Sequence, residues 1–194
     1  MARWAPTQPW WHGDAASIEA VGAYRFDDPA GEVGIETHLL SAGDGPTMQV
    51  PLTYRGAPLE GAGEALVGTM RHSLLGERWV YDASADPVYA AALAAVILTG
   101  GTQALLEVES AGQRVRREST AQVAGSGSPE VEVAPIETTS AVTDERVTTI
   151  RTAALELIMR RVLDGEVATE NAETLTGVWV GNDTPVVLAL ARRR

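Results

Sequence analysis

Apolar and polar residues alternate most regularly between residues 48 and 55. A period of two is typical of a strand and places alternate residues on opposite faces. The predicted apolar face consists of Met48, Val50, Leu52 and Tyr54. Pro51 has no backbone N–H to donate, so this strand is expected either to be an edge strand or to have an unpaired N–H side.

A strongly apolar stretch, Val88 to Leu98, predicts the one long helix of the chain. Asp86 can cap its first turn, and Pro87 suits the first helical position, where no N–H is needed. Gly100 and the glycine after it favour termination. A helix with so little polar surface must be covered on nearly all sides. We therefore expect an antiparallel sheet, with strands near 48–54, 65–70 and 78–81, to wrap around it.

Shorter elements are expected before residue 48. A brief helix capped by Asp14 or Ser17 is predicted near 14–21, followed by apolar runs at 24–28 and 32–40. Residues 42–45 have the composition of a hairpin turn. The polar side chains that alternate with the apolar set predict a face exposed to solvent or used for interaction. Its members are Glu36, His38, Gln49, Thr53, Arg55 and Arg71.

The second half of the chain is predicted to be rich in strands. Residues 124–129 are rich in glycine and serine and have a linker-like composition, and residues 130–136 alternate valine with polar or small residues. The segment 155–163 fits either a helix by propensity or a strand by its neighbours. The predicted strands are 102–109, 114–123, 138–143, 146–152, 174–180 and 185–190, the last two forming a hairpin. Two domains are expected, 1–101 and 102–194, in an α+β chain.

Composition excludes several kinds of chemistry. The 194 residues include neither cysteine nor lysine, so disulfides, thiol nucleophiles and lysine-based catalysis are excluded. The formal net charge of −11 disfavours nucleic-acid binding. The N-terminal residues lack a signal-type apolar core, and Val88 to Leu98 is too short to span a bilayer. We expect a soluble, cytoplasmic protein with no cofactor, metal or membrane partner.

The candidate functional side chains are few. Trp10 and Trp11 could plug the edge of a core, which we favour, or form a platform for sugar stacking. His38 and His72 have no ligand partner at metal spacing, which indicates surface or hydrogen-bonded histidines. Asp82 is interpreted, like Asp86, as a turn or cap residue rather than an acid–base group.

Four blocks occur in a characteristic order: PTQPWWHGD, QVPLTYRG, ALVGT and WVYDASADPVYAAALAAVI. With these blocks the first half resembles the N-terminal cap of actinobacterial maltokinases, which implies a cystatin-like sheet around a helix. The chain is most similar to small stand-alone proteins with such a cap, often labelled α-glucan branching proteins. It is too short for the catalytic barrel of a branching enzyme.

The second half resembles the small lobe of the same kinases. Residues 159–162 (MRRV) match the end of a Phe-Arg-Arg-Val run, and the nucleotide-binding lysine of the family falls on Leu157. The phosphate turn falls near Ser140 to Asp144 and lacks the Ser-Asn-Thr-Ser pattern of the family. No catalytic lobe follows in this sequence. The resemblance therefore implies a pseudoenzyme.

Three hypotheses about function follow. The first is a non-catalytic accessory protein of α-glucan metabolism that binds an α-glucan-metabolising enzyme or a glucan oligosaccharide. The second is a half-kinase completed by a separate catalytic lobe, which the missing lysine disfavours. The third is a free-standing sugar-binding or small-ligand module, which a deep pocket lined by tryptophans and Tyr54 would support. No catalytic residue is predicted, and the predicted binding residues are Trp10, Trp11, Tyr54, Arg55, Arg71 and Trp79.

Overall fold

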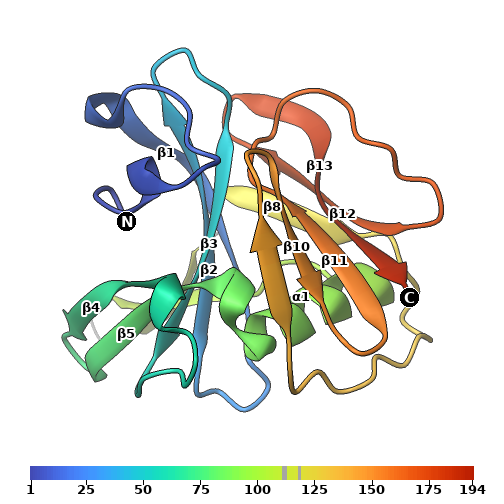
Figure 1. Ribbon diagram of the computed structural model, residues 1–194. Helices are drawn as coiled ribbons and strands as arrows, with labels where there is room; N and C mark the ends of the chain where they lie inside the picture. Colours follow the sequence, from blue (N-terminus) through green and yellow to red (C-terminus); the bar gives the residue numbers. More distant parts are fainter. Residues whose placement is uncertain (111–112, 118) are drawn as a thin grey trace.

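The described residues form two antiparallel sheets, a separate two-stranded ribbon and one α-helix, in keeping with the predicted α+β class (Figure 1). The computed structural model describes residues 1–110, 113–117 and 119–194. Within this part of the chain, no helix is long and apolar enough to cross a membrane.

The first sheet has five strands in the order β1-β2-β3-β5-β4. Its strands are β1 (Ile18–Phe26), β2 (Gly34–Ala42), β3 (Met48–Arg55), β4 (Leu66–His72) and β5 (Gly76–Asp82). All the strands predicted before residue 82 are therefore confirmed. The helix predicted near 14–21 is only a 3-10 turn, η2 (Ala15–Ser17), which the Asp14 carboxylate caps as predicted, and residues 18–21 belong to β1 instead. Three further 3-10 turns are η1 (Ala5–Thr7), η3 (Gly63–Ala65) and η4 (Ala83–Ala85).

Strand β3 is central in this sheet, so the edge-strand alternative for Pro51 is wrong. β2 pairs with β3 along its whole length, whereas β5 pairs with it only from Leu52 onward. The backbone N–H of Gln49 points away from β2 and donates to Arg161 O at 2.8 Å. Residues two apart in a strand face the same side, so the nitrogen of Pro51 also points away from β2. It lies between the contact of Gln49 with Arg161 and the start of the pairing with β5 at Leu52. The missing N–H therefore leaves no gap in the ladder with β2.

The predicted helix is α1 (Pro87–Thr99), and both of its predicted ends are confirmed. The Asp86 carboxylate accepts a hydrogen bond from the Val88 N–H at 3.0 Å. Gly100 ends the helix in the left-handed conformation, with φ of 68°, which favours glycine. The local sequence therefore predicts both ends correctly.

The second sheet has six strands in the order β8-β12-β13-β11-β10-β9. The segment whose structure was left open, 155–163, is mainly strand β11. The alternating stretch 130–136 has no strand assignment. The strands are β8 (Ala121–Gly125), β9 (Ser140–Thr143), β10 (Val147–Arg151), β11 (Leu155–Arg160), β12 (Glu173–Trp179) and β13 (Asn182–Arg193), and the ribbon is formed by β6 (Leu106–Ser110) and β7 (Gln113–Arg117). The predicted strand 102–109 is thus shorter, and 114–123 is divided between β7 and β8.

Helix α1 lies between the two sheets, and its side chains join one core with residues of both (Figure 1). Leu93 and Ile97 are fully buried there, together with Ile35 of β2 and Leu175 of β12. A helix with apolar residues on all sides is thus covered by two sheets instead of one wrapped sheet. The two sheets divide at the predicted domain boundary, but this shared core does not test the boundary itself, which stays a prediction.

The segment 124–129, which consists of the end of β8 and the loop after it, packs against the end of α1 rather than being linker-like. The N–H of Gly127 donates to Ile97 O at 2.9 Å, and the N–H of Ser128 donates to Leu98 O at 3.0 Å. A Cβ atom on Gly125 would lie 2.0 Å from Val96 O. Glycine is needed here because the backbone of the loop directly approaches the last helical carbonyls and satisfies them.

The predicted polar face of the first sheet is wrong for its central members. Gln49 and Thr53 are 1% and 0% exposed and face the core that contains α1. Glu36 and His38 lie on the opposite face, because β2 pairs Glu36 with Leu52 and His38 with Val50. Both faces of β3 are covered, so polarity does not mark the solvent side.

Gln49 joins the two sheets through its side chain. Its Oε1 accepts a hydrogen bond from the Tyr24 hydroxyl at 2.8 Å. Its Nε2 donates to Arg160 O at 2.7 Å and to Leu188 O at 3.1 Å, both in the second sheet. Burial of this amide is tolerated because its oxygen and both amide hydrogens have partners.

Candidate binding groove

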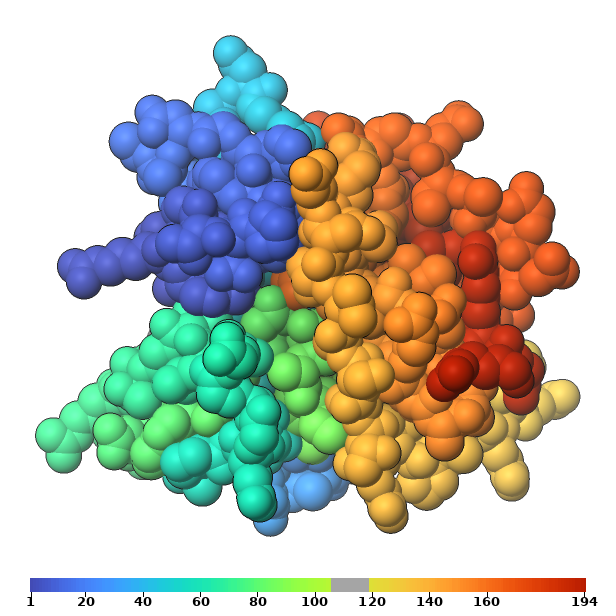
Figure 2. Space-filling view, viewed as in Figure 1, coloured from blue at the N-terminus to red at the C-terminus, as the bar shows by residue number. Residues whose placement is uncertain are grey.

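The two adjacent tryptophans serve mainly as structural residues. Trp10 is fully buried and packs edge-on against Trp4, with ring centroids 5.9 Å apart. The Arg161 guanidinium lies over the Trp10 ring, 5.1 Å from its centroid. Trp11 packs at the edge of the same cluster, and its Nε1 donates to Gly13 O at 3.0 Å. The prediction of a core plug is therefore confirmed. Residues 4–11, the N-terminal segment, cover part of the outer face of the first sheet, which is the face opposite α1 (Figure 2).

The other predicted binding residues do not gather in one place. Tyr54 lies on the outer face, whereas Arg55 and Trp79 are cross-strand neighbours on the inner face. Arg71 is exposed and pairs across the hairpin with Glu77. Since Trp10 is fully buried as well, the tryptophans and Tyr54 do not line the common pocket that the third hypothesis requires.

Two arginines form ion pairs with the aspartates that were interpreted as cap residues. Asp82 and Asp86 do cap η4 and α1, as predicted. Arg55 Nε also donates to Asp86 Oδ2 at 2.6 Å, and Arg161 Nη2 donates to both carboxylate oxygens of Asp82, at 2.8 and 2.6 Å. Hydrogen bonding to Asp86 raises the pKa of Arg55. The Arg55 guanidinium is therefore engaged in a structural ion pair.

The positions that resemble a kinase small lobe are also structural. Leu157, at the position of the nucleotide lysine, is fully buried in the core with α1. Arg160 Nη1 donates to Val187 O at 3.0 Å, and its Nη2 contacts the carbonyl oxygens of residues 164 and 165. In the turn between β9 and β10, the Asp144 carboxylate accepts the N–H groups of Arg146 and Val147, which lowers the pKa of Asp144.

An open groove lies on the part of the outer face that the N-terminal segment does not cover. Its volume is about 680 Å³, and it is lined by β2, β3, the β4–β5 hairpin and the loop between β1 and β2. The side chains of Glu36, Tyr54 and Arg78 reach it, with Met70 and Leu75 at its hairpin side. Gly34 pairs with Tyr54 across the strands, and a Cβ there would lie 3.4 Å from the Tyr54 Cβ. The sheet thus presents the tyrosine ring beside bare backbone.

Glu36, His38 and Tyr54 form a polar cluster at the groove. His38 Nε2 lies 3.4 Å from the Tyr54 hydroxyl and 3.6 Å from Glu36 Oε2. Burial lowers the pKa of His38, although the Glu36 carboxylate opposes that shift. Burial, with a smaller contribution from Glu36, raises the pKa of Tyr54 to about 12. At neutral pH the cluster therefore offers a neutral imidazole, a phenolic hydroxyl and a carboxylate.

The loop opposite the hairpin is held by one carboxylate. Asp28 accepts hydrogen bonds from the N–H groups of Ala30, Glu32 and Val33, at 3.0–3.1 Å. A loop with this many internal bonds is an ordered wall of the groove rather than a chain that must be ordered by a ligand.

The β4–β5 hairpin lies at the edge of the sheet (Figure 1) and exposes apolar side chains there. Leu74 is 87% exposed, Leu75 59% and Met70 43%. The His72 ring is hydrogen-bonded, as predicted, because its Nδ1 accepts from the backbone N–H groups of Leu74 and Leu75 at 3.2 Å. Clustered exposed leucines of this kind are typical of contact surfaces.

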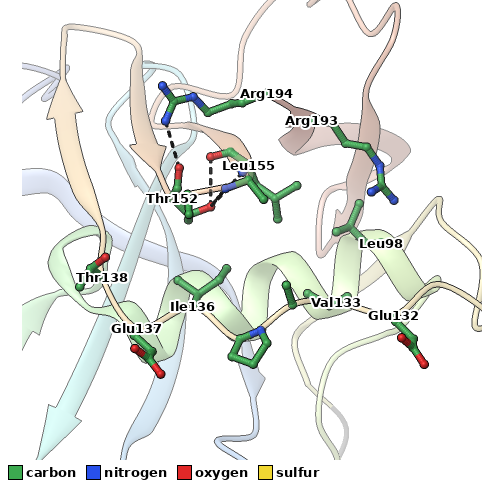
Figure 3. A pocket seen from close by; sticks show the side chains of 14 residues that line it. Leu98, Glu132, Val133, Ile136, Glu137, Thr138, Thr152, Leu155, Arg193 and Arg194 are labelled. Carbon is green, nitrogen blue, oxygen red and sulfur yellow. Dashed lines mark hydrogen bonds between the residues drawn. The ribbon is translucent and has the colours of Figure 1, made fainter.

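A second cavity, of about 410 Å³, lies between residues 132–138, the turn at 152–155 and the last two arginines (Figure 3). Arg194 Nη1 donates to Thr152 O at 3.0 Å, so this arginine is engaged with the turn. Carboxylates and guanidinium groups both line the cavity, and nothing there distinguishes a ligand class.

Residues 4–86 match the family model of the maltokinase N-terminal cap domain. This span contains all five strands of the first sheet and ends at the residue that caps α1. No curated protein matches the chain. The chain therefore contains a maltokinase N-terminal cap-like domain, as its sequence blocks predicted.

Proposed function

We propose that this protein is a non-catalytic accessory protein of maltose and α-glucan metabolism, acting by binding rather than by phosphoryl transfer. The connection to this metabolism rests on the cap-domain match at residues 4–86.

The observation that carries the non-catalytic role is the burial of Leu157. The resemblance to a kinase small lobe places the nucleotide lysine here, on β11, and this face of the strand is buried in the core that also contains α1. Tyr89 of α1 donates a hydrogen bond to the sulfur of Met159, two residues further along the same face, at 3.2 Å. A nucleotide could reach this face only if α1 moved away from the core.

The neighbouring groups support the same proposal. Phosphoryl transfer needs positioned cations at the transferring group. Arg160 donates to backbone carbonyls, and Arg161 is paired with Asp82, so neither guanidinium is free for a phosphate. The N–H groups of the β9–β10 turn already bind the Asp144 carboxylate, which occupies the place that a phosphate would need.

The exposed hairpin supports a protein partner for this accessory role. Leu74 and Leu75 make a projecting apolar tip beside the groove, and such clustered side chains favour contact with another protein. We propose an α-glucan-metabolising enzyme as this partner. Replacing both leucines with serine should abolish its co-purification with the protein, whereas Val180→Ser, another exposed apolar residue (75%), should not.

Isothermal titration calorimetry with magnesium-ATP tests the non-catalytic proposal, together with a phosphotransfer assay on maltose. The expected result is no saturable heat and no maltose phosphate above background. Micromolar nucleotide affinity, or maltose phosphate formed by the pure protein, would overturn the proposal and support the half-kinase alternative.

A further inference from the structure

We propose that the outer groove is a binding site for a neutral, hydroxyl-rich ligand such as a short glucan oligosaccharide, held between Glu36 and Arg78 on the Tyr54 ring. This inference rests on the proposed function, since it names a ligand for a protein that acts by binding. It assigns the site to the face of the sheet opposite α1.

The groove has room for a small ligand and does not have to be created by one. Its volume of about 680 Å³ lies within the range of about 300–1,000 Å³ that is usual for small-molecule sites. Backbone pairing fixes the floor on β2 and β3, and the bonds to Asp28 fix the loop on one side. A preformed site costs little conformational entropy when the ligand binds.

The charges on the lining favour a neutral ligand with many hydroxyl groups. Glu36 supplies a carboxylate acceptor, with its side chain 36% exposed. In the described part of the chain, no hydrogen bond occupies this carboxylate, and the Arg78 guanidinium donates only to the adjacent Glu77 O, at 3.0 Å. A carboxylate and a guanidinium that line the same groove can bind donor and acceptor hydroxyls of one ligand. Arg25, Asp27 and Glu32 also line the groove, so a ligand with a full charge of either sign would meet like charges there, whereas a neutral ligand would not.

The rest of the lining suits the apolar face of a sugar ring. The Tyr54 ring packs over Gly34, where a Cβ would lie 3.6 Å from the ring carbon Cδ2, and Met70 contributes a flexible thioether. The Tyr54 hydroxyl stays protonated at neutral pH and can donate to a ligand oxygen. His38 Nε2 lies 3.4 Å from the Tyr54 hydroxyl and 3.6 Å from Glu36 Oε2, so we regard His38 as a residue that positions these two side chains.

Two-dimensional ¹H–¹⁵N spectra of the full chain, titrated with maltose and maltotriose, test this inference. We expect saturable shifts at the amides around Glu36, Tyr54 and Arg78, with a millimolar dissociation constant. Glu36→Gln and Arg78→Gln should each weaken binding at least about fivefold, because each removes a hydrogen bond to a charged group. Asp183→Asn, which removes an exposed carboxylate of the second sheet, should leave the affinity unchanged.

The absence of saturable shifts at about 50 mM sugar, a concentration far above a millimolar dissociation constant, would overturn the inference. Saturable shifts located on another face, or equal affinities in all three variants, would also overturn it. Because nucleotide is not used, a protein that fails to bind sugar leaves the non-catalytic proposal intact. Nucleotide binding would contradict that proposal alone.

Discussion

Replacing Arg161 with methionine is expected to lower the free energy of unfolding by about 3–5 kcal/mol, because it leaves a buried carboxylate unpaired. Arg161 is fully buried, and Asp82 is 7% exposed. The substitution removes both hydrogen bonds to Asp82, the bond to Thr148 at 2.7 Å and the contact with the Trp10 ring. The pair also connects β5 with the end of β11, so the loss weakens the contact between the two sheets.

The lower end of that range is the more realistic value for this site. Asp82 keeps two donors after the substitution, the Ser84 N–H at 3.0 Å and the Ser84 hydroxyl at 2.7 Å. These bonds reduce the cost of an unpaired carboxylate, so we expect a loss of about 3 kcal/mol. The long methionine side chain also fills part of the volume, which limits the contribution of a cavity.

Urea unfolding followed by tryptophan fluorescence and far-ultraviolet circular dichroism measures this loss, provided that the two transitions coincide. In the double variant with Asp82→Asn, the total loss should be smaller than the sum of the single losses by at least about 1 kcal/mol, because the two side chains interact directly. Arg151→Gln is the matched control. Its partner Glu156 lies at 3.1 Å, but the two side chains are 45% and 28% exposed, so the loss should stay below about 1 kcal/mol.

Additive losses in the double variant would contradict this reasoning. So would a loss of less than about 1 kcal/mol for Arg161→Met, which is the range of an exposed pair. Either result would mean that Asp82 and Arg161 do not form a desolvated pair.

Three further outcomes are expected. Leu93→Ala should cost about 2–5 kcal/mol, because Leu93 is fully buried between the two sheets; a loss below about 0.5 kcal/mol in urea would contradict the position of α1. Leu74→Ser with Leu75→Ser should change the melting temperature by no more than about 2 °C, because both side chains are exposed; a larger drop in a thermal melt would place them in the core. Burial lowers the pKa of His38, so as the pH falls the imidazole is protonated in the unfolded chain before it is protonated in the folded protein. The free energy of unfolding should therefore decrease as the pH drops through about 6.5. Urea midpoints of His38→Gln between about pH 7 and 5 should fall less steeply than those of the wild type, and an identical slope would refute the role of His38.

The ends of α1 could be predicted because their signals are local. An aspartate, a proline and a terminal glycine each act within one turn of the helix. The strand at β3 could be predicted for the same reason, but its environment could not. A period of two separates two faces without saying what covers each, and here the N-terminal segment covers one and α1 the other.

The structure of residues 155–163 could not be decided from local propensity. Leucine and methionine favour a helix, and the strand pairing of β11 with β10 and β13 overrides that preference. Partners this distant in sequence leave no local signal. The same holds for Arg161 and Asp82, which are 79 residues apart.

The residues that form the groove could be predicted only in part from the sequence. Tyr54 was singled out by residue type, whereas Glu36 and His38 were grouped with the wrong face. Their spacing of two along β2 did place them on one face together. The cross-strand neighbour that completes the cluster is fixed by the register of β2 and β3, which only the folded sheet defines.

The central claim, a cap-like protein that binds without transferring phosphate, is tested most directly by titrating magnesium-ATP into the pure protein and then assaying maltose phosphorylation. We predict no saturable binding and no product, because Leu157 is fully buried in the core that contains α1. Saturable micromolar binding of nucleotide, or formation of maltose phosphate, would contradict the account.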